Sequence, residues 1–225
     1  FRLIKDKVLQ TSKDRICGFV GDMINMEASY CFKELFSKVL QTNNYESRTN
    51  YSYLDTRDRK NYLFNTKIKN IEESDLIILI GTNPRFEATI LNSRIRKAFI
   101  NNKTAIFSTN DVGDLTYPYK FINGDTETIK NISEDNHDLS EKIKNSTKPL
   151  IIFGQSSLLL KSFGFIFESL KTFLVKNNKI TDEWNSLNII SNDASTVGSF
   201  DLGIYKNTNN ENEVLKNLQH NIYEV

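Results

Sequence analysis

The sequence has only two cysteines in 225 residues, and this scarcity excludes several kinds of metal centre. A four-thiolate zinc site or iron–sulfur cluster needs four cysteines, whereas Cys17 and Cys31 supply two at a spacing that matches neither pattern. Both lie among apolar residues, so we expect reduced, buried thiols in a non-oxidising compartment, although two cysteines could also pair as a disulfide. We therefore predict no metal site in this chain.

Long apolar runs and an excess of one charge are also missing. The longest apolar run, 76–80, is far shorter than the ~18 residues that a membrane span needs, so any membrane association is expected to be indirect. The 29 basic and 28 acidic residues are interspersed and give a formal net charge of +1. Without a basic surface, no nucleic-acid partner is predicted. Because the chain begins at Phe1 with no signal-like apolar core, we expect a processed or split piece of a longer protein.

Short apolar runs that alternate with helical patterns are the main feature that is present. Residues 76–80 (LIILI) and 149–153 (PLIIF) are continuous apolar runs, as expected of strands covered on both faces in a parallel sheet. Residues 16–20 and 104–107 predict further strands, with one more short strand near Tyr45. Apolar residues at helical offsets follow three of these strands: Ala28, Cys31, Phe32, Leu35, Phe36 and Val39; Ala88, Leu91, Ile95, Ala98 and Phe99; and Phe163, Ile166, Phe167, Leu170 and Leu174.

This alternation predicts the fold class. Right-handed crossovers between parallel strands place helices on both faces of the sheet. We predict an α/β fold with a doubly wound, mostly parallel sheet and helices on both faces, in a chain long enough for one large domain or two small lobes. The stretch after Lys176 is less regular and is expected on a neighbouring surface.

The turn Gly81, Thr82, Asn83, Pro84, Arg85 after the 76–80 strand is the main candidate for a binding site. A strand that runs through a turn into a helix is where α/β proteins bind anions, because the helix N-terminus offers free N–H groups. The turn lacks the G-x-G-x-x-G fingerprint and a Walker lysine. Asn83 as an N-terminal cap and Pro84 at the first helical position are sufficient structural explanations. We interpret the turn as a vestigial, architectural loop.

No group for acid–base or nucleophilic catalysis stands out. The two histidines, His137 and His220, lie in polar segments without a serine or cysteine motif, so surface positions are predicted. The sequence has two neighbouring carboxylate pairs, Glu72 with Glu73 and Glu134 with Asp135, and both are expected to be solvated charges. No catalytic residue is predicted.

Three cations, Arg94, Arg96 and Lys97, form either a docking patch or an ordinary solvated helix face. No acidic residue lies four positions before any of them, and the nearest preceding one is Glu87. We favour the docking interpretation slightly.

Three runs of residues carry a resemblance to a known family: NYLFNT at 61–66, IEESDLIILIGTNPRFEA at 71–88 and LNSRIRK at 91–97. Further similarities follow in the same order, namely DLTY at 114–117, KP at 148–149, DEW at 182–184 and DLG at 201–203. In these runs, which extend over almost the whole chain, the sequence resembles the large peripheral-arm subunit of respiratory complex I, the NADH:ubiquinone oxidoreductase.

The resemblance implies a subunit of a proton-pumping enzyme at the matrix side of the mitochondrial inner membrane. In that family an N-terminal part holds iron–sulfur clusters, and the remainder is similar in fold to molybdopterin oxidoreductases. Residues 1–225 would belong to that cofactor-free remainder, and the cluster-bearing part and other complex I subunits would be partners. The implied role is a scaffold that supports the cluster-bearing part and does not catalyse.

The sequence departs from true molybdopterin enzymes at two places. In those relatives a His-Pro pair follows the loop, and Asp-Pro-Arg ends the next strand, groups similar to those that hold the pterin dinucleotide. Here Ala88-Thr89 and Ser108-Thr109-Asn110 stand instead. Because arginine is suited to bidentate phosphate binding, its absence argues against a pyrophosphate site. The alternatives are a fragment of an active molybdopterin-dependent oxidoreductase and a free-standing interaction module.

Overall fold

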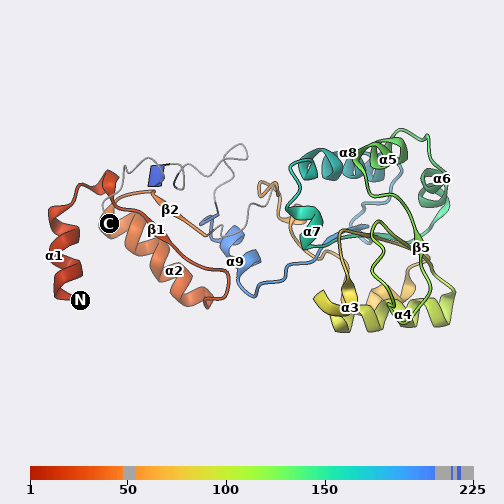
Figure 1. Ribbon diagram of the computed structural model, residues 1–225, viewed down its shortest axis with the longest axis horizontal. Coiled ribbons are helices and arrows are strands. Elements are labelled where there is room, and N and C mark those ends of the chain that lie inside the picture. The colour runs from red at the N-terminus through yellow and green to blue at the C-terminus, as the bar shows by residue number, and fades with distance from the viewer. Residues whose placement is uncertain (48–53, 206–213, 215–216, 219–225) are drawn as a thin grey trace. The chain divides into compact units, whose positions relative to one another are not determined.

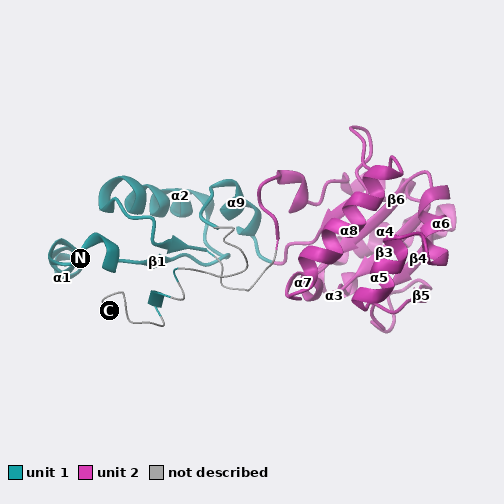
Figure 2. Ribbon diagram, turned by 90° about the horizontal axis from the view of Figure 1, so that it is seen from above, with its two compact units in different colours: residues 1–51, 193–225 teal, residues 52–192 magenta. Residues whose placement is uncertain are grey.

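The protein forms two compact units in a computed structural model that describes residues 1–47, 54–205, 214 and 217–218. Unit 1 comprises Phe1–Tyr51 and Asp193–Val225, and unit 2 comprises Ser52–Asn192 (Figure 2). This division rests on contacts within the chain and does not test to which protein family each unit belongs. The assignment of residues 1–225 to one molybdopterin-oxidoreductase-like domain therefore stays a prediction.

Unit 2 contains a five-stranded sheet in the order β5-β4-β3-β6-β7, and all neighbouring strands are parallel. The strands are β3 (Leu76–Ile80), β4 (Ala105–Ser108), β5 (Lys120–Phe121), β6 (Pro149–Phe153) and β7 (Leu187–Ile189). Leu79 lies opposite Ser108 and Ile80 lies opposite Phe153, so the three central strands end at the same edge. The predicted α/β class with a mostly parallel sheet is confirmed.

Helices cover both faces of this sheet (Figure 1). One face carries α3 (Pro84–Glu87) and α4 (Thr89–Asn102), with the 3-10 helix η4 (Ile68–Glu73) packed against α4. The other face carries α5 (Thr126–Ser133), α6 (Asp138–Asn145), α7 (Gln155–Leu158) and α8 (Phe163–Lys176). Another 3-10 helix, η3 (Arg59–Asn61), precedes η4 in the chain. Within the described ranges, no helix combines the length and apolarity that crossing a membrane requires.

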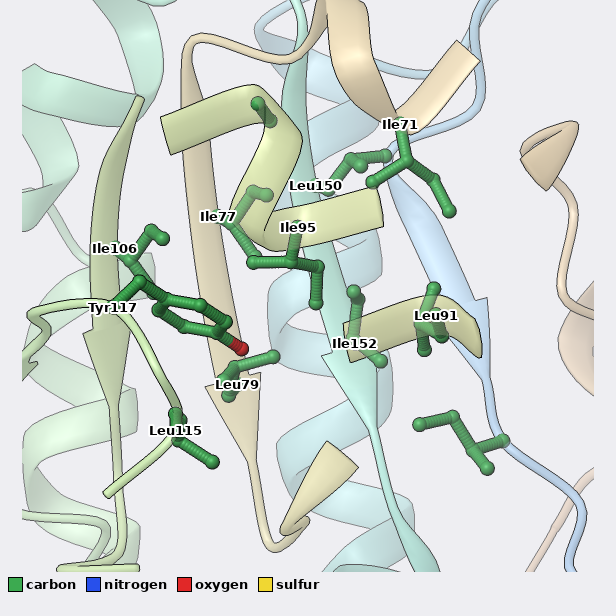
Figure 3. Packing of buried hydrophobic residues seen from close by; sticks show 12 residues of the cluster. Ile71, Ile77, Leu79, Leu91, Ile95, Ile106, Leu115, Tyr117, Leu150 and Ile152 are labelled. Atoms are coloured by element: carbon green, nitrogen blue, oxygen red, sulfur yellow. The ribbon is translucent and has the colours of Figure 1, made fainter. Parts of the chain in front are cut away.

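The core between α4 and the sheet explains the continuous apolar run of β3. Ile77 and Leu79 face Ile95 of α4 together with residues of the neighbouring strands, and each cluster member is at most 7% exposed (Figure 3). The alternate residues Leu76 and Ile78 are also buried, because α5 and α8 cover the opposite face. Helices on both sides of β3 thus account for its five buried apolar side chains.

Unit 1 is built around a two-stranded parallel sheet in which Gly18 lies opposite Tyr45. Asn25 caps α2 (Met26–Glu34) by accepting a hydrogen bond from the Ala28 N–H at 2.8 Å, and the predicted short strand near Tyr45 is confirmed. The elements of this unit are α1 (Arg2–Gln10), η1 (Lys13–Arg15), β1 (Gly18–Phe19), α2 (Met26–Glu34), the π-helical η2 (Leu35–Leu40), β2 (Tyr45–Glu46) and α9 (Thr196–Asp201).

Several predictions about the ends of the chain are wrong. The strand predicted over 16–20 is only β1. The predicted helix face, which extends over α2 and η2, is buried at Phe36 but exposed at Cys31, Leu35 and Val39. Two strands are too few to cover a wide apolar stripe, and a π-helical turn rotates the later residues away. The stretch after Lys176 is less regular than the preceding units, as predicted, but its expected place on a neighbouring surface is wrong for β7, which joins the five-stranded sheet.

Candidate functional site

The loop between β3 and α3 has the backbone geometry that its sequence predicts. Gly81 has φ +59°, and a Cβ atom there would lie 2.5 Å from the Ser157 backbone nitrogen, so both conformation and space require glycine. Asn83 caps α3 through its Oδ1 atom, which accepts from the Arg85 N–H at 3.2 Å, and Pro84 occupies the first helical turn. The predicted cap and proline position are confirmed.

The carboxylate of Glu87 binds the donors that this loop would offer to an anion. Its Oε1 atom accepts from the Asn83 N–H at 2.7 Å, and its Oε2 atom accepts from Thr82 Oγ1 at 3.1 Å. Glu87 lies one turn into α3 and so places a negative charge over the positive end of its own helix. A phosphate at this position would meet that carboxylate, and the two like charges would repel.

Arg85 and Asn83 are used to hold the loop against residues 112–114. Arg85 Nη1 donates to the Asp114 backbone oxygen at 2.6 Å and to its Oδ2 atom at 2.9 Å, and Asn83 Nδ2 donates to the Val112 oxygen at 3.2 Å. The pKa of the Asp114 carboxyl is lowered, first by a hydrogen bond from the Thr116 N–H and also by the one from Arg85. The guanidinium of this loop is therefore engaged within the chain.

A pocket of about 300 Å³ lies beside Gly81 at the carboxyl edge of the sheet. The Gly81 N–H donates to Thr109 Oγ1 at 3.1 Å, and Thr109 Oγ1 donates in turn to Asn110 Oδ1 at 2.9 Å. Ser108 Oγ donates to the Asn110 backbone oxygen at 2.7 Å. Among the described residues that line the pocket, none is charged. These residues do not fit a pterin dinucleotide, whose pyrophosphate needs cations or free donors.

A larger cavity of about 570 Å³ involves Lys60 and Lys67 as well as Asp182 and Glu183. Trp184 also lines it and donates from Nε1 to the Pro149 oxygen at 2.9 Å, at the start of β6. Because charges of both signs are mixed around this cavity, it points to no particular ligand class.

The charged residues singled out in the sequence are mostly in ion pairs. Glu72 forms an ion pair with Arg94 and lies 3.8 Å from Lys97 Nζ, while Glu73 pairs with Lys148. No acidic residue lies four positions before Arg94 or Lys97, and their acidic partner comes instead from another element. Glu72 reaches α4 from η4, 22 residues before Arg94, and this sequence distance hid the pair from a helical spacing.

The remaining candidates do not come together with this loop. His137 is half-buried and caps α6, with Nδ1 accepting from the Leu139 N–H at 3.1 Å, whereas His220 lies outside the described residues. Glu134 and Asp135 are exposed and pair with Lys130 at 3.8 Å and Lys144 at 2.5 Å. Both charges are thus solvated, as predicted.

The cysteines are separate free thiols in the described part of the chain. Cys17 is half-buried, and burial raises the pKa of its thiol. Cys31 is exposed, so the prediction that both thiols are buried is wrong for this residue, which lies on the uncovered side of α2. Across residues 1–47 and 54–205 we find no group of three or more His, Cys, Asp or Glu side chains that could hold a metal ion.

Comparison with known proteins shows the family of the chain. The family described as molybdopterin oxidoreductase matches residues 1–223. The chain is 38% identical over 207 residues to the NADH-ubiquinone oxidoreductase 75 kDa subunit of Reclinomonas americana, which covers 86% of this chain and 30% of that protein. It is 34% identical over 205 residues to a protein of Rickettsia prowazekii (strain Madrid E) that is named as a subunit of NADH-quinone oxidoreductase, covering 90% of this chain and 30% of that protein.

A third relative is the NADH dehydrogenase (ubiquinone) iron-sulfur protein 1, mitochondrial, of Solanum tuberosum, with 28% identity over 202 residues, 90% of this chain and 27% of that protein. The chain thus spans between 27% and 30% of the length of these relatives. The family match extends over nearly the whole sequence, and the parallel sheet flanked by helices is consistent with it. This chain belongs to the molybdopterin oxidoreductase family.

Proposed function

We propose that this chain is part of the large peripheral-arm subunit of respiratory complex I and serves there as a scaffold. The observation that carries this proposal is the 28% to 38% identity, over most of the chain, to proteins named as subunits of NADH-ubiquinone or NADH-quinone oxidoreductase. Its partners are other complex I subunits, including the iron–sulfur part of the same large subunit. Its location is the matrix side of the mitochondrial inner membrane.

The use of the sheet's carboxyl edge supports a scaffold role. In open α/β sheets this edge is the usual place for ligands. Here Glu87 binds the loop donors, Arg85 binds Asp114, and Thr109 accepts from the Gly81 N–H. The Asn83 and Gly81 N–H groups and the Arg85 guanidinium, which could hold a phosphate, thus already have partners within the chain. The edge therefore contributes stability, while the chemistry of the complex belongs to other parts of it.

The assembly is tested by native electrophoresis of membranes from cells that express a tagged copy of this chain. We expect the tag to migrate with NADH dehydrogenase activity in one large complex. A tag that migrates alone, or with an assembly that lacks this activity, would contradict the proposal and favour a free-standing interaction module. Mass spectrometry of the intact subunit from the same band would define the polypeptide that contains residues 1–225.

The non-catalytic role is tested with Arg85→Gln. Removing the guanidinium breaks the contact with Asp114, but no electron carrier or substrate is expected at this loop. We expect the NADH-to-quinone turnover of each assembled complex to stay near that of the unmodified complex. If the variant assembles fully and yet loses most of its turnover, the loop binds a functional ligand and the scaffold role is wrong.

A further inference from the structure

The outer face of α4 carries cations and large apolar side chains without a carboxylate. α4 contains Arg94, Arg96 and Lys97 and no acidic residue. Ile90 and Ile100 are 71% and 52% exposed, and Phe86, just before α4, is 81% exposed. Because residues 90, 97 and 100 are seven and three positions apart, they lie along one face of the helix. We name Phe86, Ile90, Arg96, Lys97 and Ile100 the α4 surface.

The packing of α4 fixes this surface outward. Leu91 and Ile95 point into the core against β3 and β6 (Figure 3). On the same inner side, Asn92 Nδ2 donates to the Leu115 oxygen at 3.1 Å, and Asn92 Oδ1 accepts from Tyr117 Oη at 2.7 Å. Burial raises the pKa of the Tyr117 phenol, which keeps it a hydrogen-bond donor. A rotation of α4 that buried the α4 surface would break these contacts.

The positive charge of α4 is only partly compensated. Glu72 is the one carboxylate within ion-pair distance of α4 among the described residues, and it serves both Arg94 and Lys97. Arg96 forms no ion pair within residues 1–47 and 54–205, and the Asp114 carboxylate, which pairs with Arg85, also interacts with Arg96 electrostatically. Since the whole chain has a net charge of only +1, this excess is a local property of the α4 surface.

We propose that the α4 surface binds an acidic polypeptide surface of another protein. Phe86, Ile90 and Ile100 would be the apolar anchors, while Arg96 and Lys97 would pair with Asp or Glu side chains of the partner. Aromatic residues and arginine are enriched in protein interfaces, and complementary charge increases the rate and specificity of association. The proposal rests on the proposed function in one respect, because the partner is sought in the assembly that the proposed function names.

The arrangement of side chains disfavours two other occupants. A helix that lies on a bilayer has one continuous apolar face with cations at its flanks. On α4, Lys97 lies between Ile90 and Ile100 on the same face, so inserting both isoleucines would also bury the ammonium group. A nucleic-acid backbone would attract the cations but would leave Phe86 and Ile90 uncovered. An acidic protein surface satisfies both kinds of side chain.

Carbodiimide cross-linking of the native assembly tests the chemistry of the partner, because this reagent joins an amine to a carboxylate in direct contact. We expect mass spectrometry to find Lys97 Nζ joined to an Asp or Glu of another polypeptide. The Glu72 carboxylate, 3.8 Å from Lys97 Nζ, is the competing intrachain target. Lys97 joined only to Glu72, or to nothing, would overturn the proposal.

Charge reversal gives a quantitative test. In the Arg96→Glu/Lys97→Glu variant, we expect the fraction of chain in the assembly to fall about tenfold or more at low salt. The matched control is Lys142→Glu/Lys176→Glu, which reverses two exposed lysines on α6 and α8. The unfolding midpoint of each variant is measured alongside, because Lys97→Glu replaces the contact with Glu72 by a like charge and Lys176→Glu places a negative charge in the last turn of α8. Ile90→Gln, at an exposed position, removes an anchor without changing charge and should also weaken association. Equal assembly of all variants would overturn the proposal.

The outcomes separate this proposal from the proposed function. If the chain migrates with NADH dehydrogenase activity and Lys97 is not cross-linked to another chain, the proposed function stands and the proposed binding by the α4 surface is wrong. If the chain forms a different assembly, cross-linking of Lys97 in that assembly still decides on the surface. A chain that migrates alone contradicts both. Sedimentation with vesicles that contain anionic lipid, lost on charge reversal, would assign the surface to lipid and overturn the proposal.

Discussion

At the scale of single residues, Glu87 and Gly81 together determine what the loop after β3 can hold. Gly81 allows the chain to turn against Ser157, and Glu87 then binds the amide and hydroxyl donors that the turn presents. An anion bound by other proteins at such a place is thus replaced by a side chain of the same loop. We therefore expect the loop to be stable without a ligand.

The requirement for glycine at position 81 is tested by comparing Gly81→Ala with Gly113→Ala. Both residues have positive φ, +59° and +70°, but only Gly81 has atoms within 4 Å of the added Cβ. We expect Gly113→Ala to lower the free energy of unfolding by about 1 to 2 kcal/mol through backbone strain alone. Gly81→Ala should cost about 3 kcal/mol or more, since overpacking adds to that strain. Equal losses of unfolding free energy, measured by urea denaturation, would show that the close contact of the added Cβ with Ser157 costs nothing.

The two cysteines should differ in reactivity. Burial raises the pKa of the half-buried Cys17 thiol, so less of it is thiolate near pH 8, whereas Cys31 is exposed. We expect iodoacetamide to modify Cys31 several-fold faster than Cys17 in the folded chain, as followed by peptide mass spectrometry. The difference should vanish in denaturant. Faster modification of Cys17 in the folded state would contradict the structure of unit 1.

At the scale of elements, the amino end of β3 is tied to the segment that leads into β6. The Asp75 carboxylate accepts hydrogen bonds from Ser146 Oγ, from the Thr147 N–H at 2.6 Å and from the Lys148 N–H at 3.0 Å. β3 and β6 are neighbours in the sheet but lie about seventy residues apart in sequence. One side chain therefore fixes where two central strands begin.

This contact makes a prediction about pH. Burial acts to raise the pKa of Asp75, but the hydrogen bonds from Ser146, Thr147 and Lys148 outweigh it and lower the pKa below 3.8. A carboxyl with a lowered folded pKa stabilises the fold above its unfolded pKa, and this contribution is lost as pH falls through the folded value. Asp75→Asn should therefore cost on the order of 1 kcal/mol at pH 7, because the carboxylate is partly screened by water.

The measurement is the free energy of unfolding at pH 7 and near pH 3 for both proteins. Between these values the unmodified chain should lose more stability than Asp75→Asn, and the difference isolates Asp75 from other carboxylates whose pKa is lowered, such as Asp55 and Asp125. A parallel pH dependence in the two proteins would mean that Asp75 contributes nothing.

At the scale of the whole molecule, the length of the chain relative to its relatives can be set beside the completeness of its core. The chain spans at most 30% of the relatives described above, yet unit 2 has its own buried core on both faces of the sheet. A section with such a core can hold its shape while its outer faces contact other polypeptides. This is the physical basis for the proposed scaffold role.

The absence of a pterin is a prediction about the purified complex. Because Glu87 and the uncharged pocket beside Gly81 do not fit a pyrophosphate, we expect no molybdenum, tungsten or pterin attributable to this chain. Elemental analysis and pterin fluorescence of the isolated complex provide the measurement. Molybdenum in a one-to-one ratio with the chain would instead favour the alternative, a fragment of an active molybdopterin-dependent oxidoreductase.

The sequence by itself determined the central strands, the turn at 81–85 and the helices that follow them. These features depend on local chemistry: continuous apolar runs, a glycine at positive φ and an asparagine cap before a proline. Their periods and spacings are visible in one stretch of chain. The family resemblance depended on the same stretches.

Only the tertiary structure decided which charges meet and which apolar residues are covered. Glu72 reaches Arg94 from another element, and Glu87 folds back onto its own loop in a way that no spacing specifies. Cys31 lies in an apolar pattern and is exposed, because the two-stranded sheet of unit 1 leaves that side of α2 uncovered. Pairing and burial depend on what lies across space from a residue, and residues distant in sequence supply those neighbours.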